Sequence, residues 1–107
     1  MILRVLFDHD DTRILMSRMA IASGHWADVI VSLEGSRVAS MTVTDKTNGK
    51  TIRVGKLLLQ KGYAYAMTRV TDIAAHGSAG PFNLTNKAAD AVLQLTVFKR
   101  IRYPFPD

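Results

Sequence analysis

The dipeptide Asn48-Gly49, which stands between two β-prone runs, is the feature that most restricts how this 107-residue chain can fold. Residues 38–46 and 50–54 are rich in apolar and β-branched side chains, and Asn-Gly favours a two-residue turn in which both residues adopt a positive φ. In that register Thr47 faces Lys50 and Val43 faces Val54. The sequence therefore predicts an antiparallel hairpin over residues 38–54.

The same register separates the side chains of the hairpin into an apolar and a polar face. The apolar face carries Met41, Val43, Ile52 and Val54, and the polar face carries Thr42, Thr44, Lys46, Thr51 and Arg53. A hairpin that covers a core with one side and meets water with the other shows this alternation.

Further elements are expected on both sides of the hairpin. Short apolar or alternating runs predict strands over residues 2–7, 26–33, 63–70 and 96–103, with 26–33 as a central strand. Residues 12–22 are expected to form a helix that Asp10, Asp11 or Thr12 caps and that stops before Gly24, although a strand alternation competes there. Shorter helices are expected within residues 55–62 and from a Thr85 cap to residue 95, and residues 74–83 are expected to form a loop.

Composition limits the class of protein. Apolar residues make up 48% of the chain and charged residues 21%, which suits one globular domain over residues 1–107 and argues against a disordered chain. The absence of cysteine excludes a disulfide scaffold and a thiolate zinc site. No apolar run reaches the length of a membrane span, and the N-terminus does not resemble a signal peptide, so we expect a cytoplasmic protein without a membrane partner. The expected fold is α+β, a mainly antiparallel sheet with two or three short helices.

Basic residues are concentrated after residue 36, and they predict a polyanionic partner. Formal net charge is −2 over residues 1–36 and +7 over residues 37–107. Such an excess favours nucleic acid, with aromatic side chains beside the cations suited to single strands. The candidate binding residues form one group around the hairpin, Lys46, Lys50, Arg53, Lys56 and Lys61, and a second near the C-terminus, Lys99, Arg100 and Arg102. The alternative is that these cations only solvate the surface and that the aromatic side chains belong to the core.

An acidic cluster near the N-terminus suggests a different chemistry. Residues 5–12, Val-Leu-Phe-Asp-His-Asp-Asp-Thr, resemble the first motif of haloacid-dehalogenase-like phosphatases. The resemblance implies that Asp8 attacks phosphorus and that Asp10 handles the leaving-group proton with Mg²⁺ between them. A structural role at a helix start explains the same residues, and Asp72 and Asp90 stand alone rather than as a companion acidic pair.

Two other candidate sites use histidine. A metal could be held by Asp8, His9 and Asp10 with His25 or His76, but no two histidines have helical i, i+4 spacing. Ser78 and His76 lack the spacing of a nucleophile elbow. We therefore expect no catalytic activity, no metal and no cofactor.

The competing hypothesis is an interaction module that binds protein. The expected strand over residues 96–103 would place Phe98, Ile101 and Tyr103 at a sheet edge, with Phe105 after it, and an apolar edge invites pairing with a copy of the chain or with another protein. Small basic accessory proteins of phages or mobile elements have this general character. The sequence thus predicts a non-catalytic binding module, for nucleic acid first and for protein second.

Overall fold

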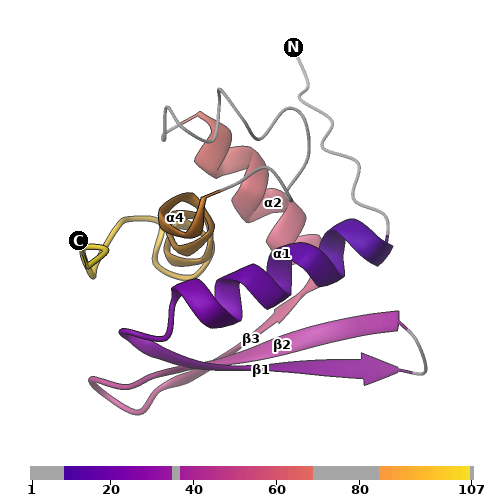
Figure 1. The fold of residues 1–107 in the computed structure, drawn as a ribbon, viewed down its shortest axis with the longest axis horizontal. Helices are drawn as coiled ribbons and strands as arrows, with labels where there is room; N and C mark the ends of the chain where they lie inside the picture. The colour runs from indigo at the N-terminus through magenta and orange to yellow at the C-terminus, as the bar shows by residue number, and fades with distance from the viewer. Residues whose placement is uncertain (1–8, 35–36, 69–84, 107) are drawn as a thin grey trace.

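In the computed structural model, which describes residues 9–34, 37–68 and 85–106, three helices cover one face of a three-stranded antiparallel sheet (Figure 1). The elements follow the order α1 (His9–Ala22), β1 (Ala27–Glu34), β2 (Arg37–Asp45), β3 (Thr51–Gly55), α2 (Lys56–Met67) and α4 (Asn86–Phe98). The predicted α+β class and the hairpin within it are confirmed. None of the described helices is long and apolar enough to cross a membrane.

The described sheet has the order β1-β2-β3, so β2 is central and β1 lies at an edge. The prediction of a central strand over residues 26–33 was therefore wrong. Both connections between the strands are short, and each strand consequently pairs with the one before it in the chain. The apolar content of β1 reflects the packing of Val29 and Val31 against the core rather than burial on two sides.

The hairpin register differs from the predicted one by two residues. Val43 pairs with Ile52 and Met41 with Val54, which leaves residues 46–49 as a four-residue loop. Gly49 has the expected positive φ of 72°, but Asn48 does not. Side chains account for the longer loop, because the Asp45 carboxylate accepts a hydrogen bond from the Thr47 amide at 2.8 Å and the Asn48 side chain accepts one from the Lys50 amide at 2.9 Å.

A shift of two residues leaves every side chain on its predicted face, because side chains alternate with period two. Met41, Val43 and Val54 are buried beneath the helices, and Ile52 is partly buried there. The opposite face has no helix over it among the described elements (Figure 1). It carries Arg53 and the threonines of β2 and β3, and an exposed Ile30 lies on the same face.

α2 is one continuous helix where the sequence predicted a short helix followed by a strand. Its buried residues are Leu59, Gly62, Tyr63 and Ala66, the i, i+3, i+4, i+7 spacing of a helix face. Gly62 does not end the helix. It allows α2 to approach α4, since a Cβ added at Gly62 would overlap the side chain of Thr96, whose own Cβ would be 2.6 Å away. Residues 69–70 of the predicted strand lie outside the described residues.

α4 begins as predicted and continues further. The Thr85 hydroxyl accepts a hydrogen bond from the Ala88 amide at 3.1 Å and caps the helix. The helix runs to Phe98 and ends at Lys99, which adopts a left-handed conformation with φ 63°. The predicted strand over residues 96–103 was wrong, because 96–98 are helical and the residues after them form an irregular segment packed on the core.

The helical interpretation of residues 12–22 is confirmed by α1, which ends at Ala22 before Gly24. The helix begins at His9, so Asp10, Asp11 and Thr12 belong to its first turn and none of them is the residue that precedes it. The predicted strand over residues 2–7 and the loop over 74–83 lie outside the described residues.

Candidate nucleic-acid interface

The predicted cations lie in four different parts of the fold. Lys46 lies in the loop between β2 and β3, and Lys50 directly follows that loop. Arg53 lies on the side of the sheet opposite to the helices. Lys56 and Lys61 belong to α2. The residues after α4, called here the C-terminal segment (99–106), carry Lys99, Arg100 and Arg102.

The C-terminal segment is anchored by one buried glutamine. The Gln94 side-chain oxygen accepts hydrogen bonds from the backbone amides of Arg102 and Tyr103, both at 2.8 Å. Its side-chain nitrogen donates to the Tyr103 carbonyl at 2.8 Å and to the Asp90 carboxylate at 2.9 Å. An amide side chain can satisfy a donor and an acceptor of an extended backbone at once, and Gln94 therefore fixes residues 102–103 without a strand.

A second buried group, Asp90, joins the end of α1 to α4. Its carboxylate accepts hydrogen bonds from the Ser23 hydroxyl and the Trp26 indole N–H, both at 2.7 Å. The His25 side chain is 3.6 Å away, and the edge of its ring meets Phe105. Asp90, isolated in the sequence, is therefore a structural residue that orients Trp26.

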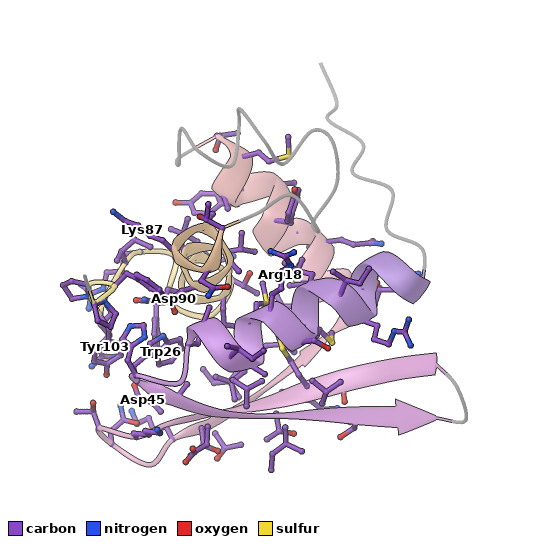
Figure 2. The ribbon with its side chains drawn as sticks, in the orientation of Figure 1. Arg18, Trp26, Asp45, Lys87, Asp90 and Tyr103 are labelled. Carbon is purple, nitrogen blue, oxygen red and sulfur yellow. The ribbon has the colours of Figure 1, made fainter. Side chains whose placement is uncertain are left out.

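Tyr103 links the C-terminal segment to the hairpin loop. Its ring stacks on Trp26 with a centroid distance of 5.4 Å, and its hydroxyl donates to the Asp45 carboxylate at 2.8 Å. Trp26, Asp45 and Tyr103 lie together at the end of the molecule where β2 turns into β3, with Asp90 next to Trp26 (Figure 2). Residues 58 positions apart in the chain thus meet at one place.

Electrostatics at this contact favour an ionised carboxylate. Burial raises the pKa of Asp45, but the hydrogen bonds from Tyr103 and Thr47 and the positive charge of Arg102 outweigh that effect. The pKa of Asp45 is consequently lower than its ordinary value of 3.8. A negative charge is therefore kept beside Arg102 and is partly neutralised by it.

The hairpin loop and the C-terminal segment enclose a small pocket of about 50 Å³. Its apolar walls come from Trp26 and Phe98 together with three aliphatic side chains, Val43, Ile52 and Val97. Its polar lining is Asp45, Asn48, Lys50 and Arg102. The volume accommodates a few water molecules or the edge of a planar ring, and not a whole nucleobase.

The cationic side chains differ in the contacts that they already make within the protein. The Lys46 ammonium donates to the Gly24 carbonyl at 2.7 Å, Lys99 lies over the Tyr65 ring, and the Arg102 guanidinium lies 5.3 Å from the centre of the Phe98 ring. Within the described part of the chain, the Lys50 and Arg100 side chains form no hydrogen bond or ion pair. Both are exposed.

The structure brings together only part of the predicted site. Lys50 and Arg102 line one pocket although the two predicted groups are far apart in sequence. Arg53 faces the other side of the sheet and donates to Ser40, and Lys56 lies at the far end of β3. Asp45 and Asn48 were not predicted as site residues. An Asp-x-x-Asn-Gly loop is the sequence signal that could have indicated them.

The phosphatase-like and Ser–His hypotheses depend on residues that lie outside the described ranges, namely Asp8, His76 and Ser78. Asp10 belongs to the first turn of α1. No group of three or more histidine, aspartate or glutamate residues in the described ranges could hold a metal ion.

Comparison of the chain with protein-family models, with curated proteins and with solved structures finds no match.

Proposed function

We propose that this protein binds single-stranded nucleic acid at the surface formed by Asn48, Lys50 and Arg102, called here the loop–tail surface. The observation that carries the proposal is the convergence of Lys50 and Arg102 on one pocket. Both cations can contact phosphate, and phosphate contacts supply most of the affinity of non-specific binding.

A single strand suits the loop–tail surface better than a duplex does. The pocket between the cations has aromatic and aliphatic walls, and Phe98 is partly exposed there. An unpaired base can place its edge against such walls while its phosphates contact Lys50 and Arg102. Trp26 is buried and the partly buried Tyr103 stacks on it, so we expect little stacking of bases on these rings, and weak binding with little sequence preference.

The test is fluorescence anisotropy with a labelled single-stranded oligonucleotide of about 20 nucleotides, titrated at several salt concentrations. Replacement of both Lys50 and Arg102 by alanine should lower the affinity and reduce the slope of log K against log salt by about 1.4, the value for two phosphate contacts on a single strand. The single variant Lys50→Ala, which removes no hydrogen bond or ion pair among the described residues, should show half of that change.

The matched control removes the same amount of charge elsewhere. Lys56 and Lys87 lie at the starts of α2 and α4, away from the pocket. Their double alanine variant should retain a wild-type slope. An equal loss of affinity in both double variants would show binding by overall charge alone and would contradict a loop–tail site.

Protein binding is the second candidate, favoured by large apolar side chains on the surface. Ile21, Ile30 and Leu57 are each more than 60% exposed. The salt response separates the two hypotheses, because an apolar interface holds or tightens as salt rises whereas a phosphate interface weakens. Failure of the oligonucleotide to bind at a protein concentration of about 100 μM would favour the protein partner.

A further inference from the structure

We propose that two copies of this chain associate through antiparallel pairing of β1 with β1 of the copy. β1 is an edge of the described sheet, and β2 is its one strand neighbour among the described residues. An edge strand presents backbone N–H and C=O groups that another strand can pair with. The proposal is independent of nucleic-acid binding.

β1 lacks most of the features that protect an edge. It has eight residues and contains no proline and no lysine. Its pairing with β2 is regular from Ala27 to Ser32, and the irregularity comes only after Ser32. An edge of this length and regularity is a favourable template for a further strand.

Ile30 gives this edge an apolar centre. Its side chain is 66% exposed on the sheet face without helices, while its neighbours Val29 and Val31 face the helices and are only partly buried. A strand added beside β1 would cover all three. Leu57, another exposed apolar side chain, lies on the helix α2 and not on a strand.

The exposed Ile30 defines the register that we propose. Helices of both copies stay on the same side of the joint sheet only if residues of the same face are opposite one another. A twofold axis at Ile30 satisfies this and sets Ile30 against Ile30 of the copy, so that each covers the other. It also sets Val29 against Val31 of the copy.

The same axis keeps like charges apart at the centre of the interface, because Asp28 is then opposite the uncharged Ser32 of the copy. A second copy paired about Ile30 therefore matches this edge through an isologous interface.

The test exploits the absence of cysteine from the chain. In Ile30→Cys, the two thiols of a dimer would be opposite each other and should be cross-linked by a short bis-maleimide. Leu57→Cys is the matched control, since Leu57 is 74% exposed but lies on the far side of the sheet from β1. We expect cross-linking at least tenfold faster for Ile30→Cys, and equal rates would overturn the proposal.

Sedimentation of the unmodified chain provides the second measurement. The wild type should shift from monomer to dimer as its concentration rises to about 100 μM, because pairing of one short strand is a small interface. Ile30→Lys, which would place two ammonium groups together at the axis, should remain monomeric with an unchanged circular-dichroism spectrum. A wild-type chain that is monomeric over the whole range would also overturn the proposal.

Discussion

Replacement of Asp90 by alanine tests how much one buried carboxylate contributes to this fold. Asp90 is 2% exposed and accepts hydrogen bonds from Ser23, Trp26 and Gln94. The alanine variant leaves the Ser23 hydroxyl and the Trp26 indole N–H buried without an acceptor. Gln94 loses less, because its side-chain nitrogen still donates to the Tyr103 carbonyl.

The magnitude follows from the two orphaned donors. A buried donor without a partner costs about 1–3 kcal/mol, so the expected loss is about 2–6 kcal/mol of the free energy of unfolding. Each kcal/mol lowers the melting temperature of a domain of this size by roughly 4–8 °C. We therefore expect Asp90→Ala to melt at least about 8 °C below the wild type in a circular-dichroism scan.

Two further variants make this measurement decisive. Asp90→Asn keeps the size of the side chain and an oxygen that can accept from both Ser23 and Trp26, because both donate to the same carboxylate oxygen, Oδ1. It should therefore lose less stability than Asp90→Ala, and its loss arises where the amide nitrogen faces the Gln94 donor. Asp28→Ala is the matched control, since the Asp28 side chain is 71% exposed and 3.8 Å from Lys46, and it should cost less than about 1 kcal/mol. Equal melting temperatures for Asp90→Ala and Asp28→Ala would refute the assignment of Asp90 as a buried acceptor.

Three other variants probe separate features of the chain. Gly62→Ala should destabilise by about 1–3 kcal/mol in urea titrations despite the better helix propensity of alanine, and a second change, Thr96→Gly, should restore most of the loss because it removes the overlapping side chain. Gly49→Val should cost about 1–2 kcal/mol because φ is 72° there, and Gly49→Asn should cost less; equal stabilities would contradict the turn geometry. The lowered pKa of Asp45 means that the unfolded chain binds more protons below about pH 4, so stability should fall there with acid, and less steeply in Asp45→Asn than in the wild type.

The hairpin shows what local sequence can predict. Alternation of side chains determined its two faces correctly, because that pattern depends only on the strands themselves. The register was wrong by two residues because the Asp45 and Asn48 side chains bond to the loop backbone and stabilise four loop residues in place of two. The turn propensity of Asn-Gly does not take those hydrogen bonds into account.

The errors after residue 55 arise from contacts between distant parts of the chain. Gly62 was interpreted as a helix stop, whereas its role depends on Thr96, which packs against it from another helix. Residues 96–103 alternate as a strand would, but Tyr103 packs against Trp26, a residue near the end of α1. Local patterns carry no information about such partners.

The candidate site, too, could be predicted from the sequence only in part. Charge and residue type were sufficient to propose Lys50 and Arg102. Their convergence depends on the Tyr103–Asp45 hydrogen bond and on Gln94, and neither can be inferred from the spacing of basic residues.

The placement of Trp26 gives the protein an internal optical probe. Trp26 is the one tryptophan of the chain, and its indole ring is buried between Phe98 and Tyr103 while its N–H bonds to a carboxylate. It also lines the pocket that contains Lys50 and Arg102. Indole emission is sensitive to polarity and to nearby charge, so a ligand in the pocket, or release of the C-terminal segment, should change the intrinsic fluorescence without any label. Anions bound at the distant cations of α2 should leave it unchanged, and the emission spectrum therefore distinguishes where on the molecule binding occurs.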